Sequence, residues 1–419
     1  MVNKKMQTKK LKTPIPLSIW AIGLASCLLN ISSALVFSLS GIYLYGQGIG
    51  IQWISTLEHI VDGIAYVMKV FSGVISDYFR RRKMIMVIGF GMAMFSRPIL
   101  AFSVTFFAVS MAYTIIFVSR VLERIGNGMQ STPRDALVAD LSPEDIKGEC
   151  FGLRTTMTTA GSFIGAGLGI LAMYWTANNY EQIFWMACIP PILAFVILAV
   201  LVKDSKLKPE EMEGTSKPKR HPLHLNDMKR LGKPFWLLMI VVTVFMLARV
   251  SESILSLHAH KTFSLPEQWV PMVVLIYNAT NSLTAYPIGR FSDRIPRHYL
   301  LGVGCLCLVI ADLLLALAPN LTIALIGVGV WGIQVGITQS MFLALIADYV
   351  PSDLRGTSFG LFYLFSAGSI MLAGIFGGMI ADRFSISVMY IASGCIASLS
   401  IGILVVTYNL IKKKKIQTL

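Results

Sequence analysis

Twelve long apolar stretches are the feature that most constrains the fold of this chain. Crossing the hydrocarbon core of a bilayer takes roughly 20 residues of α-helix. We predict transmembrane helices at residues 17–45, 54–78, 84–104, 107–127, 151–174, 182–202, 234–257, 269–290, 299–318, 321–346, 355–380 and 386–411. The second, fourth and eighth stretches carry charged residues and are the weakest of the set. Because lipid offers the backbone no hydrogen bonds, the expected class is an all-α integral membrane protein.

The distribution of basic residues supports this topology and fixes its orientation. Only 14% of the residues are charged, against about 25% in an average soluble domain. The net charge of +14 comes from short basic clusters in the connections that follow even-numbered stretches, not from a nucleic-acid-binding patch. Lysine and arginine mark cytoplasmic loops. We therefore expect both termini and the central loop to be cytoplasmic, and no nucleic-acid partner.

A polar central segment divides the chain into two equal parts. Residues 203–233 contain three prolines and many charges, so they read as a loop between residues 1–202 and 234–419. Each part holds six predicted helices. The apolar run behind the basic N-terminal residues is too long for a signal peptide, so we expect a first transmembrane helix there.

The two parts repeat each other. Residues 136–153 read ALVADLSPEDIKGECFGL, and residues 344–361 read ALIADYVPSDLRGTSFGL. A second pair places a glycine four residues before an aspartate and follows it with arginine, at residues 73–83 and 289–297. Parallel repeats of six helices are an architecture of alternating-access transporters, with the site between the halves.

These motifs resemble those of the major facilitator superfamily over essentially the whole chain. The resemblance implies two six-helix bundles related by pseudo-two-fold symmetry, secondary transport and no enzyme activity. It also implies that the repeated loop motifs gate the cytoplasmic side. The residues concerned are Gly73, Asp77, Arg81, Gly289, Asp293 and Arg297.

Three further motifs place the chain more finely. Arg120 matches the arginine of the superfamily's span-four motif, but the usual glycine four residues later is Arg124 here. The glycines of residues 161–169 are similar to an antiporter motif in part, although packing between helices also explains them. Residues 131–137, STPRDAL, look like a loop found in a PRDAL branch of uncharacterised bacterial members. That branch implies the bacterial inner (plasma) membrane.

Ionisable residues within membrane helices are costly and are functional candidates. Asp62 is our first candidate for carrying a proton, and the others are Glu58, Glu252 and Asp312. A structural ion pair, of Asp62 with Lys69 or Arg97, is the alternative interpretation. Arg249 and Glu252, three residues apart, can also simply neutralise each other.

Polar residues inside the predicted helices are candidates for lining a substrate cavity. Helix-to-helix hydrogen bonding is the alternative for each of them. The set comprises Asn30, Tyr66, Lys69, Arg97, Arg120, Arg249, Asn278, Asn281 and Gln334.

The expected function is transport of a small polar organic solute, coupled to protons by symport. The sequence has no Walker A loop, so an ion or solute gradient must supply the energy. Multidrug-type efflux by antiport is the alternative. A polytopic enzyme or a non-transporting receptor is disfavoured, because the sequence shows no HExxH motif and no signalling domain. We expect a monomer in contact with lipid, with no cofactor and no metal.

Overall fold

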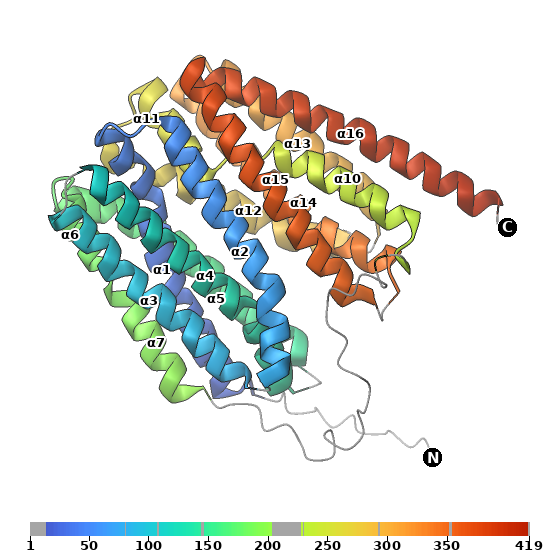
Figure 1. The fold of residues 1–419 in the computed structure, drawn as a ribbon, viewed down its shortest axis with the longest axis horizontal. Helices are drawn as coiled ribbons and strands as arrows, with labels where there is room; N and C mark the ends of the chain where they lie inside the picture. The colour runs from blue at the N-terminus through green and yellow to red at the C-terminus, as the bar shows by residue number, and fades with distance from the viewer. Residues whose placement is uncertain are drawn as a thin grey trace, which may run out of the picture.

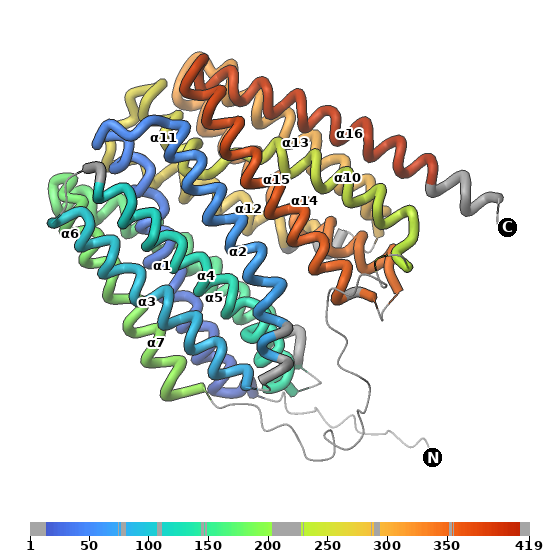
Figure 2. Tube along the Cα trace, viewed as in Figure 1, coloured from blue at the N-terminus to red at the C-terminus, as the bar shows by residue number. Residues whose placement is uncertain are grey.

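The computed structural model describes residues 14–79, 81–106, 109–143, 146–202, 228, 230–291, 294–351 and 354–417. Helices account for the regular structure of these residues (Figure 1; Figure 2). The helices of the first half are α1 (Leu17–Gly46), α2 (Ile51–Phe79), α3 (Arg82–Phe106), α4 (Val109–Leu141), α5 (Lys147–Trp175), α6 (Tyr180–Met186) and α7 (Ile189–Leu201). Those of the second half are α10 (Lys233–Leu247), α11 (Glu252–Phe263), α12 (Pro271–Phe291), α13 (Arg297–Leu317), α14 (Leu321–Tyr349), α15 (Arg355–Arg383) and α16 (Ile386–Gln417), with a short 3-10 turn, η2 (Glu267–Trp269), before α12.

Twelve membrane-crossing segments account for these helices, because two of the predicted spans are broken. The sixth span consists of α6 and α7, which meet at Ala187 and Cys188, and Pro190 and Pro191 lie in the first turn of α7. The seventh consists of α10 and α11, separated by residues 248–251. Proline lacks the backbone donor of a helix interior, which explains the first break.

Hydropathy alone finds nine of these spans within the described residues. The spans it leaves out are α2, α4 and α12, which match the three stretches that are the weakest of the predicted set. Charged and polar side chains lower the mean hydropathy of a helix even when they face other helices. The missing signal in these three helices therefore points to polar faces inside the bundle.

The fourth helix is much longer than predicted, and one motif is not a loop. We expected a span ending at residue 127, but α4 continues to Leu141. The STPRDAL segment, residues 131–137, lies within α4, so its interpretation as a loop is wrong. Pro133 is accommodated inside the helix. The polar composition of this stretch hides the helix from a search for apolar runs.

Figure 1 shows the helices of each half gathered together, with the two groups closest near α11. Within the first half α1 packs on α5 and α4 packs on α2 and α3; within the second half α13 packs on α14 and α16. Between the halves, α2 lies along α15 and α5 lies along α12.

Hydrogen bonds between the halves lie toward one end of the molecule. We call this the hairpin end; it contains residues 46–51, 175–180, 263–271 and 383–386. There the Tyr180 hydroxyl donates to Glu267 at 2.7 Å, and the backbone N–H of Ile51 donates to Asp382 at 3.1 Å. Closer to the middle, the Ser55 hydroxyl donates to the carbonyl of Gly374 at 3.0 Å. The halves are thus fastened together from the hairpin end inward.

Two glycines of the glycine-rich motif set the spacing between α1 and α5. A Cβ on Gly161 would lie 2.3 Å from the carbonyl oxygen of Cys27, and one on Gly165 would lie 2.3 Å from that of Ile31. Gly167 is different, because a Cβ there would meet Leu275 at an ordinary 3.9 Å. The packing interpretation therefore explains Gly161 and Gly165.

We expect Gly165→Ala to destabilise the protein by about 1–3 kcal/mol, because an added methyl group must push two helix backbones apart. The measurement is the melting temperature of the purified protein in detergent. Gly167→Ala is the matched control and should melt like the unmodified protein. Equal melting of all three proteins would contradict the assigned contact.

Candidate functional site

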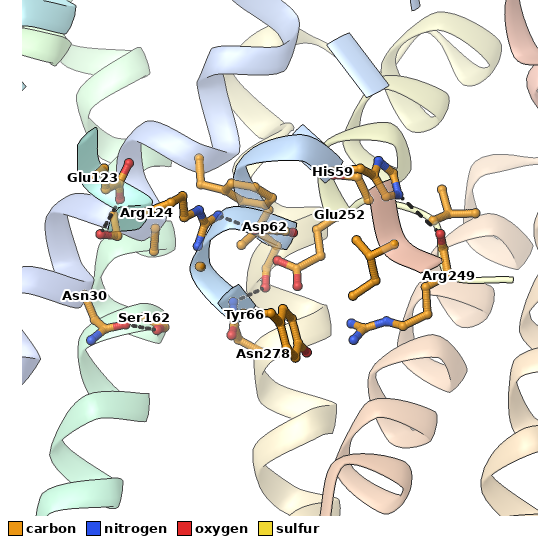
Figure 3. Close-up of a pocket in the computed structure, with 18 of the residues that line it drawn as sticks. Asn30, His59, Asp62, Tyr66, Glu123, Arg124, Ser162, Arg249, Glu252 and Asn278 are labelled. Atoms are coloured by element: carbon orange, nitrogen blue, oxygen red, sulfur yellow. Dashed lines mark hydrogen bonds and ion pairs between the residues drawn. The ribbon is translucent and has the colours of Figure 1, made fainter. Parts of the chain in front are cut away.

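A cavity of about 280 Å³ lies between the two halves, midway along the helices. The first half contributes residues from α1, α2, α4 and α5, and the second half contributes α12, α14, α15 and the break between α10 and α11. Its polar and charged lining consists of Asn30, Ser33, His59, Asp62, Tyr66, Lys69, Glu123, Arg124, Ser162, Arg249, Ser251, Glu252 and Asn278. Figure 3 draws 18 of the lining residues and labels ten, including Asp62, Tyr66 and Glu252, which come from both halves.

The helix break at residues 248–251 brings backbone and charge to the cavity. Ser251 caps α11 by accepting from the N–H of Ser253, and Glu252 begins that helix. The carbonyls released by the break have partners: Ser393 donates to Ala248 at 2.5 Å, and His59 Nε2 donates to Arg249 at 3.2 Å. An interrupted helix in a membrane protein is tolerated where such groups are satisfied inside the protein.

A buried network of four charged residues lies beside the cavity, formed by Glu58, Arg97, Arg120 and Glu123. Glu123 accepts two hydrogen bonds from Arg97, at 2.6 and 2.9 Å, and a third from Arg120 at 2.8 Å. Arg120 also donates to Glu58 at 2.8 Å. All four side chains are at most 1% exposed. Two arginines balance two glutamates, so the buried network is neutral as a unit.

Asp62 pairs with Arg124 at 3.2 Å, and both side chains face the cavity (Figure 3). The carboxylate is 35% exposed and the guanidinium 23% exposed, so this pair is far more open than the buried network. Arg124 stands where the span-four motif normally has glycine. The departure from the motif thus supplies the partner of Asp62, in place of Lys69 or Arg97.

Two cavity cations rest on aromatic rings. The Lys69 ammonium lies 4.7 Å from the ring centre of Tyr66 and 5.5 Å from that of Tyr363, on the opposite half. The Arg249 guanidinium lies 5.7 Å from the ring centre of Trp331. Within the described residues, neither cation has a carboxylate within 4.0 Å. Glu252 lines the same cavity and lies near Tyr277.

The family model named Major Facilitator Superfamily matches this chain over residues 22–368 and again over residues 253–417. The chain belongs to the major facilitator superfamily. It is therefore an integral multi-pass membrane protein and a secondary transporter, not an enzyme.

Relatives within the superfamily agree with this assignment. The chain is 24% identical over 351 residues to an uncharacterized MFS-type transporter of Methanocaldococcus jannaschii, covering 83% of this chain and 84% of the relative. It is 27% identical over 140 residues to the quinolone resistance protein NorA of Staphylococcus aureus, 33% of each chain. The crystal structure of the nucleoside transporter NupG superposes with a TM-score of 0.74 at 12% identity, covering 93% of this chain and 98% of that one. At that identity it shows a shared superfamily fold alone.

Five of the nine predicted cavity residues line the cavity: Asn30, Tyr66, Lys69, Arg249 and Asn278. The other four do not. Arg97 and Arg120 belong to the buried network, where they hold Glu58 and Glu123. Gln334 is 1% exposed and donates to Thr338, and Asn281 lies where α12 packs closely on Gly332 and Gly336 of α14. In this structure none of these four residues is part of the cavity lining.

The loop motifs form the same contact in each half. Arg82 at the start of α3 pairs with Asp140 and donates to the carbonyl of Ala136. Arg297 at the start of α13 pairs with Asp348 at 2.6 Å and donates to the carbonyl of Ala344. In the first half the pairing residue is thus Arg82, while the predicted Arg81 is exposed.

The glycines and aspartates of the gating prediction are described only in part. A Cβ on Gly73 would lie 3.2 Å from Thr132 of α4, so Gly73 permits close packing within the first half. The side chain of Asp77, the surroundings of Gly289, and Asp293 lie outside the described residues.

The predicted proton carriers occupy three different environments. Asp62 and Glu252 line the cavity, Glu58 pairs with Arg120, and Asp312 is buried between α13 and α16, where one of its oxygens contacts Ser393 at 2.6 Å. Sequence reasoning missed Glu123 and His59. Glu123 could have been found from its spacing, because it lies three residues after Arg120 on the same helix face. No sequence pattern pointed to His59, which directly follows Glu58.

Proposed function

We propose that this chain moves a small polar organic solute by alternating access, in symport with protons. The observation that carries the proposal is the cavity, because charged and hydrogen-bonding groups from both halves meet there midway through the bundle. A cavity of about 280 Å³ lies at the lower end of the range for ligand pockets, about 300–1,000 Å³. That size suits a small metabolite.

One hydrogen-bond arrangement supports protons as the coupling ion. Ser393 contacts both the carbonyl of Ala248 and Asp312, yet a hydroxyl has one hydrogen. Both contacts are hydrogen bonds together if Asp312 carries a proton and donates to Ser393.

We assign proton carriage first to Asp62, because its ion pair with Arg124 is accessible from the cavity. Protonation of Asp62 would release Arg124 and so change the charge that the solute meets. Glu252, Asp312 and Glu58 follow as candidates. Glu58 is the least accessible, because it is 1% exposed within the buried network.

Multidrug-type efflux is the second candidate. The partial match to NorA and the glycine-rich motif of α5 favour it. The close contacts of Gly161 and Gly165 with α1 give those glycines a packing role instead. The abundance of ion pairs and fixed charge around the cavity also suits a polar solute better than an apolar drug.

The remaining assignments complete the proposal. The positive charge of the loops supports a cytoplasmic location for both termini and the central segment. On this orientation the hairpin end faces outward. We also propose a monomer of two six-helix domains, residues 1–202 and 234–419, in a bacterial inner membrane, and membership of the PRDAL branch, which residues 131–137 support.

Uptake into proteoliposomes tests the proposal. A panel of radiolabelled metabolites is offered with and without an inward proton gradient of about one pH unit. One-proton symport would concentrate its solute up to about tenfold, because one pH unit is worth about 1.36 kcal/mol. Extrusion of dyes under the reversed proton gradient, with no metabolite accumulated under the inward one, would favour efflux instead.

A further inference from the structure

We infer that the cavity binds a small organic anion, whose negative group sits between Lys69 of the first half and Arg249 of the second. This names the substrate class for the transport proposed above and rests on that proposal. The argument comes from the charges that remain once every ion pair around the cavity has been counted.

Most charges at the cavity are already satisfied. The Asp62 carboxylate has Arg124, and Glu123 has both Arg97 and Arg120. Of the cavity-lining charges, this leaves Lys69, Arg249 and Glu252. Two cations against one carboxylate give an excess of one positive charge where a solute must bind.

The two cations are held in place without being neutralised. Lys69 lies over the rings of Tyr66 and Tyr363, and Arg249 lies over Trp331. Cation–π contacts attract these groups but leave their N–H donors free for an acceptor. A guanidinium and an ammonium that line the same cavity suit a carboxylate or another small oxyanion.

The cavity lining also includes a third group that can donate a hydrogen bond to a solute. Trp331 lines the cavity and is fully buried, and its indole Nε1 has no hydrogen-bond partner among the described residues. A buried donor without a partner carries an energetic cost that a ligand acceptor removes. The N-terminus of α11, at Glu252, adds its positive end near the cavity. These features together favour a ligand group that only accepts hydrogen bonds.

Two sets of three probes test this inference, and the members of each set are similar in shape but differ in charge. Benzoate, benzamide and benzamidinium, with butyrate, butyramide and butylammonium as the aliphatic set, are titrated against the purified full-length protein while thermal stabilisation is recorded. We expect the carboxylates to bind at least about tenfold more tightly than their neutral and cationic counterparts. Equal or tighter binding of an amide or a cation, or no stabilisation by either carboxylate, would overturn the inference.

Substitutions locate the anion. Lys69→Gln and Arg249→Gln should each weaken benzoate binding about tenfold or more, whereas Lys69→Arg and Arg249→Lys keep the charge and should lose less. Lys261→Gln is the matched control, because Lys261 also lies over a tyrosine, Tyr45, but is exposed outside the cavity. Unchanged benzoate affinity in both glutamine variants would place the anion elsewhere.

Failure of this inference can be told apart from failure of the transport proposal. Proton-driven accumulation of neutral or cationic solutes in proteoliposomes would contradict the anion site and still support proton symport. If carboxylates bind selectively but do not accumulate under a proton gradient, the anion site is supported and coupling to protons is contradicted.

Discussion

Replacing Glu123 by glutamine is expected to destabilise the protein by about 3–5 kcal/mol, because it leaves buried positive charge without its counter-charge. Glu123 joins two arginines, and neither it nor Arg97 is more than 1% exposed. A glutamine side chain keeps the size but has one acceptor oxygen and no charge. The measurement is the melting temperature in detergent together with the yield of monodisperse protein.

The double variant Arg97→Gln/Glu123→Gln makes this prediction specific to charge. Removing both partners leaves Arg120 with Glu58, so no uncompensated charge is buried. We therefore expect the double variant to be more stable than Glu123→Gln alone. Glu181→Gln, at an exposed position of α6, is the control for a lost carboxylate. Equal stability of Glu123→Gln and Glu181→Gln would refute the buried network as a structural element.

Asp62→Asn is expected to abolish proton-driven accumulation while exchange of solute continues. Asparagine resembles the protonated aspartate, so the pair with Arg124 stays released and no proton is carried. With a gradient of about one pH unit, the accumulation ratio should fall from up to about tenfold to about one. The readouts are uptake under the gradient and counterflow exchange without it, both in proteoliposomes.

Comparison with other variants identifies the carrier. Glu181→Gln should accumulate solute like the unmodified protein. Full accumulation by Asp62→Asn would remove Asp62 from proton carriage. A selective loss of accumulation in His59→Gln or Asp312→Asn would then move the role to whichever of these two buried residues shows it.

Most of the fold could be predicted, because the length of an apolar run and the charge of a connecting loop can each be read from a short stretch of sequence. The bounds of α1 and α16 agree with the apolar runs to within a few residues at their membrane ends. The end of α4 could not be predicted in this way, because residues 128–141 are polar while still helical. The break before Glu252 was also hidden, since residues 248–251 contain no proline or glycine.

The site could be predicted only in part, for a geometric reason. Asp62, Tyr66 and Lys69 are four and three residues apart, a spacing that puts them on one face of a helix, and they do line the cavity together. Partners across helices cannot be read from spacing. Arg97 was assigned to the cavity because it is charged, yet Glu123 on the neighbouring helix holds it in the interior. Local periodicity says which residues share a face, but not which helix that face meets.

Hydrogen bonds that join the two halves lie at the hairpin end, and their position affects how the halves can move. A helix of 29 residues such as α2 is about 44 Å long, so it acts as a lever when one half rocks against the other. A tilt of about 10° about the middle of such a helix displaces its ends by about 4 Å, but moves atoms within about 5 Å of the pivot by less than about 1 Å. Rocking would therefore break the contact of Asp382 with α2. Lys69 and Arg249 lie near this pivot, so a solute bound between them keeps the same contacts while the halves rock.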